Sequence, residues 1–356
     1  MLVKSRPFVL VGLFICLISG MLGCFAQDPD KAKIARVISV SESQVNGMRE
    51  QMVELEIYKK GEQNESVFLT NNVPDNQAYA IIAQQGREYL VNFDESSGEH
   101  YISDYYREDV IVGLIILFSV LVIAFGAFKG IKALVSLALT GLAIYFVFLP
   151  GIEAGYNPIF LAVLIAAFAT ASTMILIAGF SKKALAATIG TTGGVTAAGL
   201  MGFYVIKIAP LSGLASTESH ILLANSQGLN LNFQGILAAG ILISSLGAAM
   251  DVAISIASSA QEIFEANFRQ GRRELFAHTI NIGRDIMGTM TNTLILAYTG
   301  ASIPLLILLS QDEGLRVLNV ELIATELSAA LIGSIGLLLA IPITALVSVF
   351  LLKPYK

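Results

Sequence analysis

The chain has little of what soluble enzymes and disulfide-rich exported proteins contain. Only 14% of its 356 residues are charged, against about 25% in ordinary soluble domains, while 55% are hydrophobic. This composition argues against a soluble protein and indicates an integral membrane protein. The only two cysteines, Cys16 and Cys24, both lie within the first 26 residues. A disulfide framework and thiol redox chemistry are therefore not expected in the rest of the chain.

The residues and motifs of several enzyme classes are also missing. The three histidines, His100, His220 and His278, fall outside the long apolar segments, whereas an intramembrane serine protease needs a histidine at membrane depth. The sequence has no HExxH zinc motif, no P-loop and no basic patch typical of nucleic-acid binding. Asp251 and Asp285 leave an aspartyl protease formally open, but neither has the glycine-framed context of those enzymes. We therefore expect no enzyme, no nucleic-acid partner and no cofactor other than a bound cation or proton.

What the chain does contain is a series of apolar segments of membrane-spanning length. About 20 apolar residues cross a hydrocarbon core of about 30 Å. Seven such segments follow residue 107: 109–127, 133–152, 159–180, 184–207, 233–259, 285–309 and 327–351. An eighth, at the N-terminus, has the basic front and small-residue exit of a secretory signal. Residues 1–26 are thus predicted to be a cleaved signal peptide or a retained signal anchor, with a lipoprotein site at Cys24 as a further alternative.

Basic residues mark every second connection between these segments, which predicts the orientation in the membrane. Lys and Arg accumulate in the short loops that stay in the cytoplasm. The marked connections contain Lys4, Arg6, Lys129, Lys132, Lys182, Lys183, Arg269, Arg272, Arg273, Arg284, Lys353 and Lys356. The C-terminus is therefore predicted to be cytoplasmic, and residues 27–107 extracytoplasmic.

Residues 27–107 differ from the rest of the chain because apolar and polar residues alternate there. Val53, Leu55 and Ile57 fall on one face of a strand, and Tyr89, Val91 and Phe93 fall on one face of another. Turn signals separate the strands, so we expect a small antiparallel barrel or sandwich of about five strands. The region has no metal-ligand cluster and no nucleophile with a matching histidine. It is interpreted either as a gating, docking or sensing module with an extracytoplasmic protein partner, or as a spacer that merely folds.

The segment 184–207 is rich in glycine and threonine, unlike the apolar segments before it. Small residues let membrane helices approach closely, so this segment is expected inside a helical bundle. Its sequence GTTGG, residues 190–194, has two interpretations: close packing of an intact helix, or local unwinding that exposes backbone carbonyls to an ion.

Two later segments carry polar stripes at helical spacing. In the first, Ser244, Gly247, Ala248, Asp251, Ser255 and Ser258 share a face, and in the second, Asp285, Gly288, Thr289, Asn292 and Thr299 do so. Ionisable groups within a membrane are expensive and persist mainly where they face a cavity or a partner. Asp251 is therefore predicted to face inward. Counting residues from the inner boundary places Asp251, Thr289, Asn292, Thr188 and Thr192 at one level.

Each aspartate also has a plainer interpretation. An acid at a helix start is favoured by the positive end of the helix dipole, which applies to Asp285 beside Arg284. Asp251 lies near the inner headgroups if its helix is displaced along the membrane normal. The connection 260–283 carries Phe264, Phe268 and basic residues, and is predicted to lie partly as an amphipathic helix on the inner surface.

Three stretches of the sequence resemble a known family. They read GAAMDVAISIASS (247–259), GRDIMGTMTNTLILAYTGASIPLLILL (283–309) and LIGSIGLLLAIPITA (331–345). They resemble the YibE/F-like family of bacterial multi-pass membrane proteins, and the β region ending in YISDYYRED fits the layout of that family. The resemblance spans nearly the whole chain from about residue 33. It implies a topology in the bacterial plasma (inner) membrane rather than an established activity.

Together these features predict an α-helical membrane bundle of about seven spans with a small all-β extracytoplasmic domain. The bundle is expected to translocate a small solute or ion. Asp251 would bind a cation or proton, because hard cations take oxygen ligands, with Asn292, Thr289 and Thr192 completing the site. Thr188, Ser255 and Asp285 are further candidate site residues. The alternative is a non-transporting scaffold or sensor whose β domain engages a partner outside the cell.

Overall fold

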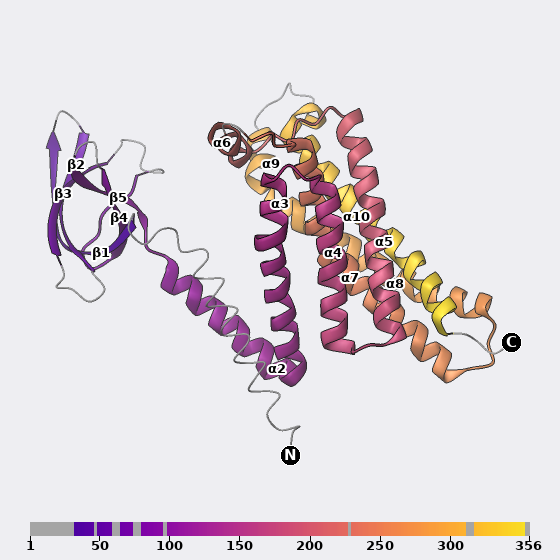
Figure 1. Ribbon diagram of the computed structural model, residues 1–356. Coiled ribbons are helices and arrows are strands. Elements are labelled where there is room, and N and C mark those ends of the chain that lie inside the picture. The colour runs from indigo at the N-terminus through magenta and orange to yellow at the C-terminus, as the bar shows by residue number, and fades with distance from the viewer. Residues whose placement is uncertain are drawn as a thin grey trace, which may run out of the picture. The chain divides into compact units, whose positions relative to one another are not determined.

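The structure is a computed structural model, and it describes residues 32–45, 48–58, 65–73, 80–94, 98–226, 229–310 and 317–352. The predicted signal segment, residues 1–26, lies outside the described residues. The described part of the chain divides into two compact units, with the division between Ala127 and Phe128. The first unit is built on a β-sheet, and the second is helical (Figure 1).

The β unit contains five antiparallel strands. They are β1 (Ala32–Val45), β2 (Met48–Ile57), β3 (Glu65–Val73), β4 (Glu88–Asp94) and β5 (Glu99–Tyr105). The sheet order is β3-β2-β1-β4-β5, so β4 returns to lie beside β1 after the β1–β2–β3 meander, which is a Greek key. β3 and β5, the two outer strands, also contact each other. The sheet therefore curves into a small barrel of the kind found in OB folds, in agreement with the predicted barrel of about five strands.

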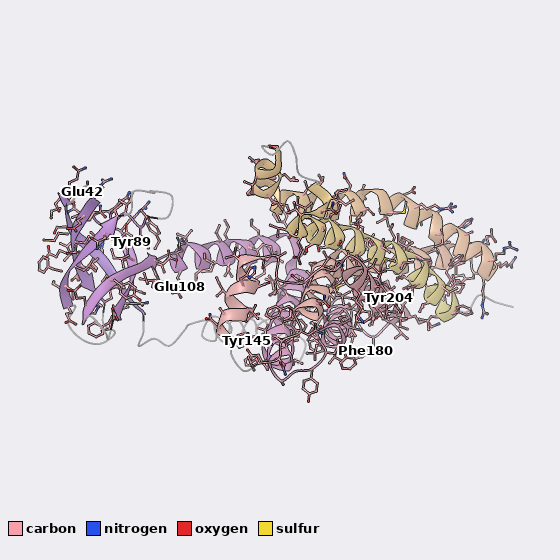
Figure 2. All side chains as sticks on the ribbon, turned by 90° about the horizontal axis from the view of Figure 1, so that it is seen from above. Glu42, Tyr89, Glu108, Tyr145, Phe180 and Tyr204 are labelled. Carbon is pink, nitrogen blue, oxygen red and sulfur yellow. The ribbon has the colours of Figure 1, made fainter. Side chains whose placement is uncertain are left out.

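The alternation predicted for the strands is confirmed in the barrel core. Val53, Leu55 and Ile57 are fully buried, and so are Tyr89 and Val91, whereas Phe93 is 52% exposed near the end of β4. Figure 2 shows Tyr89 among the strands of the barrel. The barrel therefore closes around the first residues of β4 and opens toward its last ones.

A buried amide holds the long β3–β4 connection against the barrel. The Gln51 Oε1 atom accepts hydrogen bonds from the Ala83 amide at 2.9 Å and from the Asn71 side chain at 3.1 Å. The Tyr89 hydroxyl donates to the Ile82 carbonyl at 3.0 Å. These side chains satisfy backbone groups that have no strand partner, as a buried polar segment requires.

The helical unit begins within a long helix and ends near the C-terminus. Its helices are α2 (Glu108–Ala143, shared with the β unit), the π-helical turn η1 (Ile144–Phe148), α3 (Leu149–Glu153), α4 (Pro158–Ala178), α5 (Lys182–Ile208), α6 (Thr217–Asn225), α7 (Phe233–Ala266), α8 (Arg272–Ala301), α9 (Ile303–Ser310), the 3-10 turn η2 (Val317–Asn319) and α10 (Glu321–Leu352). α5 packs against α4, α7 and α10, and α8 packs against α7 and α10 (Figure 1).

The glycine-rich segment forms an unbroken helix, which decides between its two interpretations. α5 runs without interruption from Lys182 to Ile208. A Cβ atom placed on Gly194 would lie only 2.6 Å from the Gly336 carbonyl oxygen of α10, so only glycine allows this approach. The glycines of GTTGG therefore serve close packing of α5 against α10, and the segment does not unwind.

Five helical stretches of the described chain are long and apolar enough to cross a membrane. They are Glu108–Glu153, Pro158–Ala178, Lys182–Ile208, Phe233–Ala266 and Glu321–Leu352. The predicted count of seven is not confirmed, for two reasons. Segments 109–127 and 133–152 belong to one helical stretch, broken at Ala127, where φ is 46°. Segment 285–309 is divided between α8 and α9, and α8 is too polar to qualify by composition.

The connection 260–283 is not a separate helix. Its first residues extend α7 to Ala266, and its last residues begin α8 at Arg272. The rings of Phe264 and Phe268 lie 5.1 Å apart. The guanidinium of Arg272 lies 5.5 Å from the ring of Phe350 on α10.

Candidate functional site

The polar stripe predicted on α7 lies on one face of that helix. Ser244, Gly247 and Asp251 are exposed, whereas Leu242, Ala249 and Ala253 on other faces are buried. The Ser255 hydroxyl donates to the Asp251 backbone carbonyl at 2.9 Å, and the Ser244 hydroxyl is hydrogen-bonded to that of Tyr298 on α8. The polar residues therefore share one face of α7, and α8 contacts this face at Ser244.

Asp251 itself points outward, and the prediction that it faces the interior of the bundle is wrong. Ala253 and Ala257, on the opposite side of α7, are the residues that pack against Ala187 of α5. Asp251 lies close to the midpoint of the 34-residue α7, and no ion pair to its carboxylate occurs among the described residues. The face of α7 that contacts α5 consists of small side chains because these allow the two helices to approach closely.

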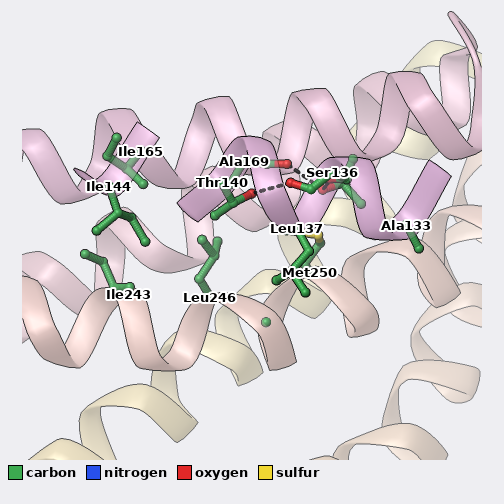
Figure 3. A pocket seen from close by; sticks show the side chains of 12 residues that line it. Ala133, Ser136, Leu137, Thr140, Ile144, Ile165, Ala169, Ile243, Leu246 and Met250 are labelled. Atoms are coloured by element: carbon green, nitrogen blue, oxygen red, sulfur yellow. Dashed lines mark hydrogen bonds between the residues drawn. The ribbon is translucent and has the colours of Figure 1, made fainter. Parts of the chain in front are cut away.

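A cavity borders the stripe. It has a volume of about 300 Å³ and lies between α2, α4 and α7 (Figure 3). Gly247, one turn from Asp251, belongs both to the stripe and to the cavity wall. The rest of the wall is apolar apart from three hydroxyls: those of Ser136 and Thr173 are hydrogen-bonded to each other, and Thr140 donates to the Ser136 carbonyl at 3.0 Å. The cavity thus has room for a few water molecules or a small solute.

The predicted site residues of α8 also lie on an outer face. Asp285, Thr289 and Asn292 are all exposed, opposite the buried Gly283 and Leu294. The Thr289 hydroxyl donates to the Ile286 carbonyl at 2.9 Å. In the described part of the chain, the Asp285 carboxylate and the Asn292 amide have no hydrogen-bond partner.

The predicted threonines of α5 lie elsewhere again. Thr188 and Thr192 line an open groove of about 530 Å³ along α5, together with Thr196. The Thr188 hydroxyl donates to the Ala184 carbonyl at 2.9 Å, and Thr192 Oγ1 is buried without a partner. The groove is lined by α5 residues alone, so no predicted site residue of α7 or α8 contributes to it. The common depth of these residues stays a prediction, and residue counting could not show which way each helix is turned.

Two features of the site were missed from the sequence. The cavity hydroxyls of Ser136, Thr140 and Thr173 come from segments that looked uniformly apolar, although the spacing of Ser136 and Thr140 was a usable signal. The bond from Tyr298 to Ser244 depends on how α7 and α8 pack, which no local pattern reveals. No group of three His, Cys, Asp or Glu side chains able to hold a metal occurs in the described residues.

The β unit has a polar hollow of its own. It measures about 630 Å³ and is lined by charged and aromatic residues from Gly86 to Val110, including Arg87, Glu88 and Tyr106. Burial, with a further contribution from the hydrogen bond that its hydroxyl donates to Asp109 at 3.1 Å, raises the pKa of Tyr106 to about 12. Tyr106 therefore stays neutral at any physiological pH and acts as a hydrogen-bond donor.

Comparison with known proteins assigns the chain to a protein family. No curated protein and no solved structure matches the chain. The model of the YibE/F-like protein family matches residues 114–354, which include every helix from α4 to η2 and most of α2 and α10. The chain therefore belongs to the YibE/F-like family, and its apolar helices are those of a multi-pass membrane protein.

Proposed function

We propose that the protein translocates a proton or another small cation, and that Asp251 binds it. The observation that carries the proposal is the position of Asp251. It is a carboxylate at the middle of a helix that is long and apolar enough to cross a membrane, without an ion partner among the described residues and one turn from a cavity. Ionisable residues at membrane depth are costly and typically mark ion or proton pathways.

A proton suits this geometry better than a dehydrated metal ion. A metal cation needs several oxygen ligands around it, whereas the groove of Thr192 is lined by α5 residues alone and Asn292 is exposed on α8. A proton needs only the carboxylate and a water chain. The cavity beside Gly247, with its three hydroxyls, is a plausible place for such water.

Reconstitution tests this function. Purified protein is placed in proteoliposomes that contain a pH-sensitive dye, and a pH gradient is imposed with valinomycin and potassium to prevent charge build-up. The expected result is a loss of the gradient that is faster than in protein-free vesicles. No acceleration for protons in this assay, and none for sodium or potassium in vesicles without valinomycin, would overturn the proposal.

A second candidate function is a scaffold or sensor that does not transport. It is favoured by the polar hollow of the β unit, whose charged lining suits a polar partner. The two functions make opposite predictions for complementation of a deletion strain. A transporter loses function with Asp251→Asn and keeps it with Arg87→Ala, whereas a scaffold shows the reverse.

The orientation of the protein remains part of the proposal. The basic connections are proposed to be cytoplasmic and the β unit extracytoplasmic. In a variant without native cysteines, Glu218→Cys on α6 should react with an impermeant thiol reagent in intact cells, whereas Asn267→Cys between α7 and α8 should not. Both positions are exposed, so access to the reagent is not limited by burial. Labelling of Asn267→Cys alone would reverse the orientation.

A further inference from the structure

The contacts of α8 place its second half beside the middle of two membrane-spanning helices. A Cβ atom on Gly283 would lie 3.1 Å from the Ile256 side chain of α7, and it would also meet Ile341 of α10. Fifteen residues later, the Tyr298 hydroxyl is bonded to Ser244 of α7. α7 and α10 are both long and apolar enough to cross a membrane. Residues 283–298 of α8 therefore lie at the same depth as the central parts of α7 and α10.

At this depth α8 presents a polar face that nothing in the described chain covers. The residues opposite its packed face are exposed, and we call them the α8 outer face: Asp285, Gly288, Thr289, Asn292, Leu296 and Thr299. An amide without a hydrogen-bond partner is strongly unfavourable in hydrocarbon, because nothing there replaces the hydrogen bonds that the amide makes in water. Lipid is therefore the least favourable neighbour for Asn292, and a protein surface is a better one.

We propose that the α8 outer face packs against the same face of a second copy of this chain. Copies in one membrane share an orientation, so a closed pair has its two-fold axis along the membrane normal, and each residue on the axis meets its own copy at the same depth. Amides both donate and accept, so Asn292 can bond to Asn292 of the second copy. A Cβ atom on Gly288 would meet nothing within 4 Å, which leaves the space for close approach of two helices.

The charges on α8 are complementary in such a pair. Arg284 and Asp285 are both exposed. Successive residues of a helix are turned by about 100°, so these two side chains lie on opposite sides of Gly288 around the helix axis. In a two-fold pair of parallel helices, a residue on one flank faces a residue on the opposite flank of the other copy. Arg284 of one copy therefore faces Asp285 of the other. Within its own chain Arg284 donates to the Asn281 side chain at 3.1 Å, and this bond leaves the other guanidinium donors available.

Cysteine cross-linking in membranes tests this interface. In full-length protein with Cys16 and Cys24 replaced by serine, Asn292→Cys is oxidised with copper phenanthroline and analysed without reductant. The expected product has twice the mass of the chain, and it contains both tags when two differently tagged copies are co-expressed. The matched control is Ile189→Cys on the exposed side of α5, which lies at a similar depth because Gly199 of α5 faces Leu242 of α7. This control should remain monomeric.

A second variant keeps the test decisive where Asn292→Cys reduces the amount of folded protein. Leu296→Cys lies one turn further along the same face, is 59% exposed and removes no polar group. The proposal is overturned if neither position forms the doubly tagged product, or if Ile189→Cys forms it equally well. It is also overturned if Asn292→Cys, with the native cysteines restored, forms an internal disulfide instead, because the N-terminal segment would then cover α8. The test reads association alone, so its outcome is independent of the transport measurement.

Discussion

The two units of the protein treat their amides differently. In the β barrel, Gln51 is fully buried and its side chain bonds to Ala83, Asn71 and Glu42. In the helical unit, Asn292 lies on α8, which packs against two apolar helices of membrane-spanning length, and it is exposed and has no partner in the described chain. The barrel thus uses this polar group to complete its own fold. The bundle leaves polar groups on its outer faces, where only a solute, water or another protein can use them.

The largest loss of stability is expected from a substitution at the close contact between α5 and α10. Gly194→Leu forces a side chain against the Gly336 carbonyl of α10, and overpacking of this kind costs about 3 kcal/mol or more. A Cβ atom on Gly288, on the α8 outer face, would meet no atom of its own chain within 4 Å, so Gly288→Leu should leave the unfolding midpoint of single chains separated in detergent unchanged or slightly higher. Thermal unfolding of the two purified variants checks this. Equal destabilisation by both would mean that the α8 outer face is already packed within the chain.

A smaller effect is expected from breaking the amide network of the barrel. Gln51→Leu leaves the Ala83 amide without its acceptor, while the Asn71 side chain keeps only the Ile81 carbonyl, and a buried group left unpaired costs about 1–3 kcal/mol. Gln44→Leu, at an exposed position of β1, is the control and should change stability by less than about 0.5 kcal/mol. Denaturant unfolding of the full-length variants measures both. If Gln51→Leu is as stable as the control, the network does not hold the β3–β4 connection.

The smallest effect on stability is expected from Glu42, an exposed residue that is hydrogen-bonded to Gln51. Hydrogen bonds from Arg49, at 2.6 Å, and from Gln51 lower the pKa of Glu42 below its ordinary value of 4.5. The folded state therefore favours the ionised carboxylate. The resulting stability is fully present above pH 4.5 and is lost as the pH falls through the lowered pKa. Glu42→Gln should lose this part of the acid dependence, which unfolding midpoints from pH 7 to pH 3 measure; an unchanged profile would show that the pair contributes nothing in solution.

The sequence predicted the parts of the fold that depend on local periodicity. Alternation at Val53, Leu55 and Ile57 was enough to place a barrel strand, and helical spacing grouped Ser244, Gly247 and Asp251 on one face. The sequence did not predict the features that depend on how neighbouring helices pack. Polar spacing alone cannot tell whether a stripe faces the bundle or looks outward, and glycine and alanine gave α7 and α5 their contact on the opposite side from Asp251. For the polar face of α8 too, the sequence alone could not show whether it faces the bundle or looks outward.

The proton flux of Asp251→Asn tests the central claim most directly. Asparagine keeps the size of the side chain and removes the ionisable group, so the protein should reach wild-type abundance. Glu262→Gln removes an exposed acid three turns further along α7 and serves as the matched control. In proteoliposomes with equal protein content, Asp251→Asn is expected to lose at least about 90% of the flux, a loss equivalent to about 1.4 kcal/mol or more in the barrier, while Glu262→Gln keeps it. Wild-type flux from Asp251→Asn would contradict the account.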